Sequence, residues 1–260
     1  MRYLIIALQF LTRLWSPVKA EVRDNRDLAR SMGAFPLVGV IIGGLMFLVY
    51  WGAVALGFGF FALLAAVTTQ CIITGCLHLD GLSDTCDALL SSRSKERMLE
   101  IMKDSRIGVM GCVGLMVDLA MKTFLLAEIA SLRAGILFML FAFSGMMLCG
   151  KLTMVCLAGM GKSARAEGLG QSFLSAVHIK IVLFTYCIGG IFFILMFGWH
   201  AVFYLALPVL AALALNTYFT RKLGGLTGDT LGAANEIGEI LFLFVLFLTN
   251  RYLGAGNLFI

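Results

Sequence analysis

Residues Ala34 to Leu56 read AFPLVGVIIGGLMFLVYWGAVAL and contain no charged side chain. A helix needs about 20 apolar residues to cross a bilayer core that is about 30 Å thick. Inside lipid, a helix is favoured because it satisfies its own backbone hydrogen bonds. This stretch therefore predicts a membrane-spanning helix.

The same pattern returns along most of the chain. Further apolar stretches lie at Phe58–Leu79, Ile107–Ala127, Ala134–Met160, Ile181–Gly198, Ala201–Thr220 and Ile237–Leu253. Hydrophobic residues make up 60% of the chain and charged residues 13%, whereas soluble domains carry about 45–50% and about 25%. We predict an all-α, polytopic membrane bundle with about seven spans, forming one domain over residues 1–260.

The amino-terminal stretch is too short to span a bilayer. Leu4, Ile5, Leu8 and Leu11 recur at helical spacing, and no small-residue cleavage site follows. The pattern favours a helix lying at the membrane interface over a removed signal peptide.

Positive charge is distributed unevenly between alternate loops. Sixteen of the 20 Lys and Arg residues lie in residues 1–32, 80–106, 161–180 and 221–222. By the positive-inside rule these segments face the cytoplasm, which predicts a multi-pass protein of the cytoplasmic (inner) membrane. Because the charges show no basic stripe with interleaved aromatic residues, no nucleic-acid partner is expected.

The most informative polar stretch is HLDGLSDTCDAL, from His78 to Leu89. Asp80, Asp84 and Asp87 are spaced i, i+4, i+7, which places three carboxylates on one helical face. A solvated helix end is the plain interpretation. However, like charges at this spacing repel, and a Mg²⁺ or Mn²⁺ ion would reverse that repulsion. We therefore favour a metal site that faces the cytoplasm.

Cations follow the acidic stretch at Arg93, Lys103 and Arg106, with Asp104 among them. Each alone is typical of a membrane-edge side chain. Together with a metal they favour a phosphate or pyrophosphate substrate, since the cations compensate its negative charge.

A third polar segment reads GGLTGDT, from Gly224 to Thr230. Its glycines permit a ligand to approach the backbone, and Asp229 adds a carboxylate on the same side. Glu236 and Glu239 are expected at the adjoining membrane edge.

Three charged residues lie inside predicted spans, where charge is costly and commonly functional. Asp118 and Lys122 are four residues apart on one span and can pair, and Lys151 lies at a similar depth on another. Pairing among these residues and contact with substrate both remain open.

At this point the sequence resembles a known family. The stretch HLDGLSDTCDALLSSRSKERMLEIMKDSRIGVMG (His78–Gly111) and the stretch GGLTGDTLGAANEIGE (Gly224–Glu239) look like the two signatures of cobalamin synthase, or adenosylcobinamide-GDP ribazoletransferase. Weaker similarities lie at Phe10–Arg13, Phe35–Gly39 and Glu167–Gly170. Lys122 fits the family pattern; Asp118 and Asn235 do not belong to it, and Lys151 stands where Arg is frequent.

The resemblance implies a late step of cobalamin biosynthesis. Such an enzyme joins α-ribazole, or its 5′-phosphate, to adenosylcobinamide-GDP and releases GMP, with Mg²⁺ required. The resemblance places the metal on Asp80, Asp84, Asp87 and Asp229, and Asp84 or Asp87 as the proton acceptor. The expected substrate-binding residues are Arg93, Lys103, Asp104, Arg106, Lys122, Lys151, Gly228 and Glu236.

Two other functions stay open from the sequence. A transporter would place polar groups and broken helices near the membrane midplane, often in repeated halves, whereas the acids here lie at one edge. A CDP-alcohol phosphotransferase acting on lipid shares spaced aspartates, but its full motif is absent. Besides the lipid bilayer, a homo-oligomer or a complex with other enzymes of the pathway is compatible with the chain.

Overall fold

The computed structural model describes residues 1–15, 18–132, 135–165 and 174–253. The chain is 82% helical, and the described residues contain no β-strand. Loop residues Ser163 and Leu226 form an isolated bridge. The predicted all-α class is confirmed.

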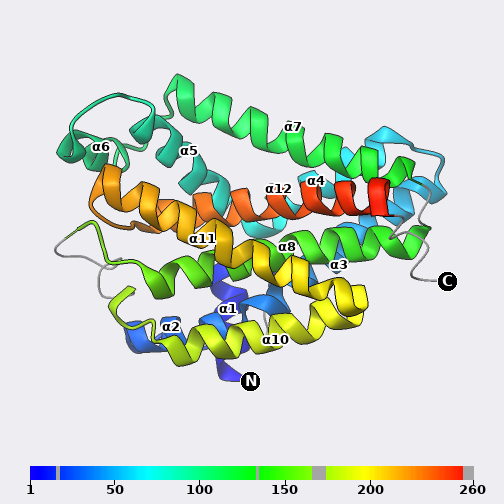
Figure 1. Cartoon of the computed structure of the whole chain (residues 1–260), viewed down its shortest axis with the longest axis horizontal. Coiled ribbons are helices and arrows are strands. Elements are labelled where there is room, and N and C mark those ends of the chain that lie inside the picture. Colours follow the sequence, from blue (N-terminus) through cyan, green and yellow to red (C-terminus); the bar gives the residue numbers. More distant parts are fainter. Residues whose placement is uncertain (16–17, 133–134, 166–173, 254–260) are drawn as a thin grey trace.

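The helices are α1 (Arg2–Leu11), α2 (Asn25–Ser31), α3 (Phe35–Ala55), α4 (Phe60–Thr74), α5 (Leu77–Leu89), α6 (Lys95–Ile101), α7 (Val109–Ser131), α8 (Ile136–Met160), α10 (Ile179–Phe197), α11 (Ala201–Leu223) and α12 (Gly228–Leu253), with 3₁₀ turns η1 (Met32–Ala34) and η2 (Gly198–His200). Figure 1 shows the long helices side by side. Helix α6, the starts of α7 and α12, and the end of α11 gather at one end, which we call the polar end.

Five described segments are long and apolar enough to cross a membrane: Asn25–Ala55, Val109–Ser131, Ile136–Met160, Ile179–Leu223 and Gly228–Tyr252. A sixth is added if α4 and α5 are counted as one bent span. The 45-residue segment Ile179–Leu223 contains α10 and α11, which η2 separates and which run in opposite directions in Figure 1. A multi-pass bundle is supported, and the number of about seven spans stays a prediction.

The second predicted span ends earlier than expected. Helix α4 stops at Thr74, and α5 leaves it at 91°. The cause is local, because Gly75 and Cys76 both adopt left-handed backbone angles, with φ of 58° and 59°. Such angles end a right-handed helix. The bend gives the acidic stretch a helix of its own, as its spacing predicted.

The last span begins earlier than predicted, at Gly228 rather than Ile237. Thr227 caps the helix: the Thr230 N–H donates to Thr227 Oγ1 at 3.2 Å, and the Thr227 N–H donates to Thr230 Oγ1 at 2.9 Å. A Thr before the first turn is a recognisable start signal. Glu236 and Glu239 therefore lie inside the helix, so their expected place in a loop is wrong, and their position at a membrane edge stays a prediction.

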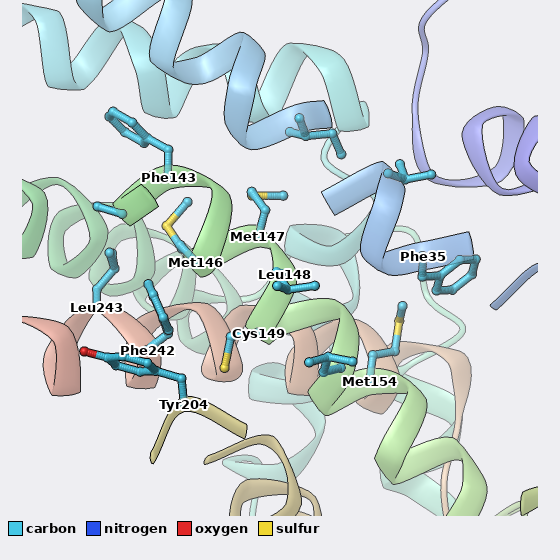
Figure 2. Packing of buried hydrophobic residues seen from close by; sticks show 14 of the residues in the cluster. Phe35, Phe143, Met146, Met147, Leu148, Cys149, Met154, Tyr204, Phe242 and Leu243 are labelled. Carbon is cyan, nitrogen blue, oxygen red and sulfur yellow. The ribbon is translucent and has the colours of Figure 1, made fainter. Parts of the chain in front are cut away.

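Helix α8 is the most buried of the candidate spans and forms the centre of the bundle. Its Phe143 and Met146 are buried in the same cluster as Phe242 and Leu243 of α12 (Figure 2). On the other side, a Cβ added to Gly43 of α3 would lie 2.4 Å from Ser144 Cα. Small residues let membrane helices approach this closely.

Helix α1 packs against the bundle through Ile6, Ala7 and Leu11, which are buried. Of the periodic residues Leu4, Ile5, Leu8 and Leu11, only Leu11 is fully buried, and Leu4 and Leu8 are partly buried against the core. The predicted helix is confirmed, and its position at the membrane interface stays a prediction.

Candidate active site

A cavity of about 460 Å³ opens beside α5 and the loop between α6 and α7. We call it the polar cavity. It is lined by Cys71, Cys76, Leu79, Asp80, Ser83, Asp84, Met102, Lys103, Asp104, Ser105, Arg106, Ile107, Leu115 and Leu119. Five of the residues predicted to form the site are therefore brought together, although the acids and the basic loop lie on separate elements.

The three aspartates that line the polar cavity differ in their hydrogen bonding. Within the described residues, Asp80 and Asp84 have no ion pair and no side-chain hydrogen bond. Asp104 instead accepts hydrogen bonds from the Arg106 side chain, at 2.7 Å from Nη2 and 3.0 Å from Nε, and from the Arg106 backbone N–H at 3.1 Å. These bonds lower the pKa of Asp104 to about 2. Asp104 thus holds Arg106 in place, while Asp80 and Asp84 remain free to bind a ligand.

Asp87 faces a different neighbour. Its Oδ2 accepts the Gly108 N–H at 2.7 Å and its Oδ1 accepts the Gly111 N–H at 2.8 Å. These are the first amides of α7, where a carboxylate is stabilised by the free N–H groups and the helix dipole. A Cβ added to Gly111 would lie 2.4 Å from Asp87 Oδ2. Asp87 therefore docks α7 on α5, and it does not line the polar cavity.

Asp229 does not line the polar cavity. Its Oδ2 is 3.9 Å from Arg165 Nη2, and its backbone lies against Gly81, where an added Cβ would be 2.8 Å from the Asp229 carbonyl oxygen. Together with Asp80, Asp229 lines a second cavity of about 220 Å³. We call this the small cavity.

The four predicted metal ligands do not form a closed set. Across the part of the chain that the structure describes, no group of three His, Cys, Asp or Glu side chains is placed to hold a metal ion. Mg²⁺, however, is commonly bound through one or two carboxylates, with water and substrate phosphates completing its shell. Asp80 and Asp84, unpaired on one cavity, fit that weaker requirement.

The glycines of the third polar loop approach the protein itself. Gly224 ends α11 with φ of 79°, and a Cβ on Gly225 would lie 2.4 Å from the Lys162 carbonyl oxygen. The Leu226 N–H donates to that carbonyl at 2.7 Å. Gly225 therefore allows the loop after α11 to pack against the loop after α8. Gly228 differs, because an added Cβ there meets no atom within 4 Å.

One predicted substrate-binding residue is exposed at the surface, away from these cavities. Arg93 is exposed and lines neither the polar nor the small cavity. The stretch Glu167–Gly170 lies outside the described residues.

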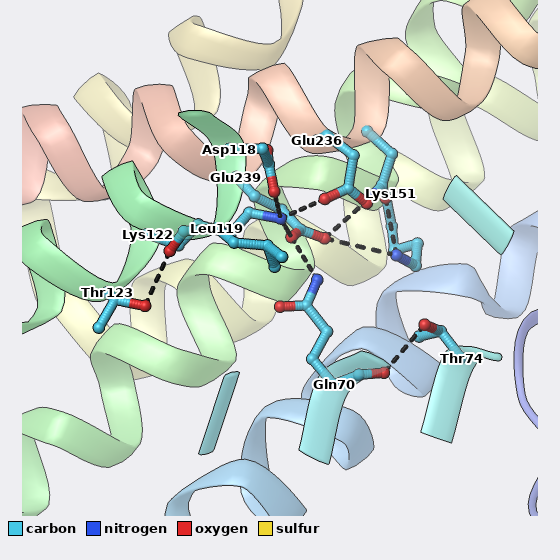
Figure 3. Close-up of polar contacts among 10 residues, drawn as sticks. Gln70, Thr74, Asp118, Leu119, Lys122, Thr123, Lys151, Glu236 and Glu239 are labelled. Atoms are coloured by element: carbon cyan, nitrogen blue, oxygen red, sulfur yellow. Dashed lines mark hydrogen bonds and ion pairs between the residues drawn. The ribbon is translucent and has the colours of Figure 1, made fainter. Parts of the chain in front are cut away.

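Seven buried polar side chains join α4, α7, α8 and α12 in what we call the buried ion network: Gln70, Asp118, Lys122, Lys151, Asn235, Glu236 and Glu239 (Figure 3). Lys122 Nζ lies 3.0 Å from Asp118 Oδ2 and 2.8 Å from Glu239 Oε2. It also contacts the Glu236 carboxylate. The predicted pairing of Asp118 with Lys122 is confirmed, and the network surrounds one cation with three carboxylates.

Lys151 occupies the other side of the network. Its Nζ donates to Asn235 Oδ1 at 2.7 Å and lies 3.8 Å from Glu239 Oε1. It pairs with α12, and not with Asp118 as its depth had suggested. The approach of the helices depends on Gly150, where a Cβ would be 2.7 Å from Glu239 Cγ and 2.8 Å from the Asn235 carbonyl oxygen.

Sequence reasoning missed two members of this network. Gln70 donates to Glu239 Oε2 at 2.7 Å, but a lone Gln in an apolar stretch gives no signal. Asn235 bridges Lys151 to both glutamates, donating to Glu239 Oε1 at 2.7 Å and Glu236 Oε1 at 3.1 Å. The i, i+1, i+4 spacing of Asn235, Glu236 and Glu239 on one helix was the available signal.

The whole chain was compared with known proteins. Residues 3–247 match the model of the cobalamin-5-phosphate synthase family. The chain belongs to this family. It is 36% identical to an adenosylcobinamide-GDP ribazoletransferase of Clostridium novyi, over 95% of this chain and 96% of that protein. It is 38% identical to the protein of the same name from Citrobacter koseri, over 92% of this chain and 96% of that protein. No solved structure matches.

The match to the cobalamin-5-phosphate synthase family covers both cavities and the buried ion network, because all their residues lie between 3 and 247. The family assignment therefore applies to the part of the molecule that carries the candidate chemistry.

Proposed function

We propose that this chain joins α-ribazole, or its 5′-phosphate, to adenosylcobinamide-GDP. The name of the relatives, adenosylcobinamide-GDP ribazoletransferase, supports this reaction. A ribose hydroxyl of the nucleoside attacks the phosphorus attached to the cobinamide side chain. The new O–P bond forms, the bond to the GMP oxygen breaks, the hydroxyl loses its proton, and GMP leaves.

The observation that carries the proposal is the pairing of opposite charges on the polar cavity. Asp80 and Asp84 lie on α5, and Lys103 and Arg106 lie on the adjoining loop. Lys103, which has no ion pair among the described residues, and Arg106 bind the diphosphate oxygens. They stabilise the charge that develops on the departing GMP. Within the loop between α6 and α7, hydrogen bonds to Asp104 hold the Arg106 side chain.

Asp80 and Asp84 would hold Mg²⁺ in this proposal. When bound, the ion neutralises diphosphate charge and polarises the phosphoryl group. The chain's own carboxylates orient the incoming hydroxyl and accept its proton. Asp87 is less suited to either role, because both of its oxygens already accept backbone amides.

In this scheme three predicted substrate-binding residues have a structural role and do not contact substrate: Lys122, Lys151 and Glu236. They are no more than 1% exposed and line neither the polar nor the small cavity. Their network joins α7 and α8 to α12, the helix whose first turn bears Asp229.

We further propose that the polar end faces the cytoplasm from the inner membrane. The concentration of Lys and Arg in the loops of that end supports this orientation. Water-soluble substrates then reach both cavities from one compartment. The transporter and lipid-phosphotransferase alternatives have no comparable support from the relatives.

The direct test is GMP release by the purified chain in lipid nanodiscs with adenosylcobinamide-GDP, α-ribazole and Mg²⁺. One GMP should appear per cobamide formed, and omitting α-ribazole should stop both. Lys103→Met should lower the rate by at least about tenfold, as expected for loss of a charged contact to phosphate. Lys180→Met, which removes an exposed cation outside both cavities, is the matched control. GMP release without α-ribazole, or a normal rate in Lys103→Met, would contradict the proposal.

A further inference from the structure

The small cavity adjoins the polar cavity at α5, because Asp80 lines both. It is lined by Phe10, Met32, Phe35, Leu77, His78, Asp80, Gly81, Met154, Gly228, Asp229, Leu231 and Gly232. Most of these side chains are apolar. The Phe10 and Phe35 rings stack at an interplanar angle of 14° with centroids 6.2 Å apart. The lining thus suits a flat, apolar group.

One buried polar atom of the lining has no hydrogen-bond partner among the described residues. His78 is 4% exposed, and among the described residues no group hydrogen-bonds to its Nε2. A buried polar atom without a partner costs free energy. A ligand that supplies one hydrogen-bonding atom would remove that cost.

We propose that the small cavity binds the benzimidazole base of the nucleoside substrate. This inference rests on the proposed function and assigns a subsite to one of its two substrates. The benzimidazole is planar and apolar and has one free ring nitrogen, an acceptor for an Nε2–H of His78. Among the described residues, the one buried side-chain polar atom of this lining that lacks a hydrogen-bond partner matches the single polar atom of the base.

Size and charge exclude the other substrate from this cavity. A volume of about 220 Å³ is below the roughly 300–1,000 Å³ of pockets for drug-sized ligands, so the corrin ring does not fit. Guanine would leave several polar atoms unpaired against Phe10, Phe35 and Met32. The Asp80 and Asp229 carboxylates accept hydrogen bonds from ribose hydroxyls, and Asp229, which is not a metal ligand in the proposed function, repels a diphosphate.

The position of Asp80 connects the two substrates. Asp80 lines both the small cavity and the polar cavity. With the base in the small cavity, the ribose lies toward Asp80, and the diphosphate lies beyond it. Asp80 is then the carboxylate placed to accept the hydroxyl proton as the O–P bond forms.

The test is equilibrium binding of α-ribazole and, separately, of GMP to the purified full-length protein. His78→Leu should weaken α-ribazole binding about threefold to tenfold, as for loss of one hydrogen bond. The KM for α-ribazole should rise by a similar factor, with GMP binding and the KM for adenosylcobinamide-GDP unchanged. His78→Gln, which keeps a donor, should restore most of the affinity.

Thr85→Val is the matched control. Thr85 lies on the same helix, is 4% exposed and has an equally unpartnered Oγ1, but it lines neither cavity. It should bind α-ribazole as the unaltered protein does. Unchanged α-ribazole affinity in His78→Leu, or a loss confined to GMP, would overturn the inference. Failure of the proposed function would appear differently, as no GMP release by the unaltered protein.

Discussion

At the scale of single residues, three aspartates with one sequence pattern have two different environments. Asp80 and Asp84 line the polar cavity, whereas Asp87 accepts the first amides of α7. The i, i+4, i+7 spacing places them on one helix but does not say what each side chain meets. Their substitutions should therefore have separable effects.

Asp80→Asn and Asp84→Asn should each reduce GMP release by at least about a hundredfold, the loss typical of removing a stabilising group at a reaction centre. Thermal stability should stay level or rise, since one like charge is removed. Asp87→Asn should instead lower the free energy of unfolding by about 0.5–2 kcal/mol, because the amide has one acceptor oxygen for the two N–H groups and no charge at the start of α7. Activity assays and thermal unfolding in the same detergent measure both. An Asp87→Asn variant as stable as the unaltered protein would refute the capping role.

The two lysines Lys122 and Lys103 offer a second contrast. Lys122 is fully buried among three carboxylates, so Lys122→Met leaves buried charges unpaired and should cost about 3–5 kcal/mol. Lys103→Met, at an exposed position, should affect rate without affecting stability. Thermal unfolding and GMP release distinguish the two outcomes. If Lys122→Met unfolded normally but lost activity, Lys122 would have a direct role in the reaction.

At the scale of elements, the contact of α8 with α12 controls the buried ion network. Lys151 reaches Asn235 and Glu239 only because Gly150 lets the two helices approach closely. Helix α12 also carries Asp229 at its first turn, next to α5. Spacing of these helices therefore sets the geometry of the small cavity.

Gly150→Ala should lower the free energy of unfolding by about 1–3 kcal/mol, because the added methyl group overlaps the Asn235 carbonyl and Glu239. GMP release should fall as α12 moves. Gly44→Ala is the control, since a Cβ at that position of α3 meets nothing within 4 Å. Its stability should be unchanged or slightly raised, as helices favour Ala over Gly. Equal stability of the two variants would argue against tight α8–α12 packing.

At the scale of the whole molecule, polarity is divided between the two ends of the bundle. The loops after α5, α8 and α11 meet at the polar end, while η2 lies at the opposite end (Figure 1). Backbone bonds between the loops at Lys162 and Leu226 hold this end together. The positive-inside rule then orients the entire protein.

Single cysteines should report this orientation. In a variant without the native cysteines that still releases GMP, Ser92→Cys and Lys222→Cys should react with an impermeant maleimide only from the cytoplasmic side. Trp199→Cys, 69% exposed in η2, should react only from the opposite side. Labelling of Ser92→Cys in intact, right-side-out cells would reverse the proposed topology.

The sequence alone determined the helical membrane class and the positions of most spans. Long apolar stretches such as Phe35–Ala55 form helices wherever they are placed in lipid, so local composition is sufficient. Local spacing also predicted the helix bearing Asp80, Asp84 and Asp87, and the pairing of Asp118 with Lys122. These features depend on residues close together in the chain.

Only the tertiary structure decided what those side chains meet. Asp87 binds amides 21 and 24 residues away, and Lys122 contacts Glu236 from 114 residues away. The bend at Gly75 and Cys76 brings α5 between two cavities, and so gives Asp80 a place in both. Such contacts depend on how helices pack against each other. Helical periodicity shows which face of a helix is apolar, but not which helix packs against that face.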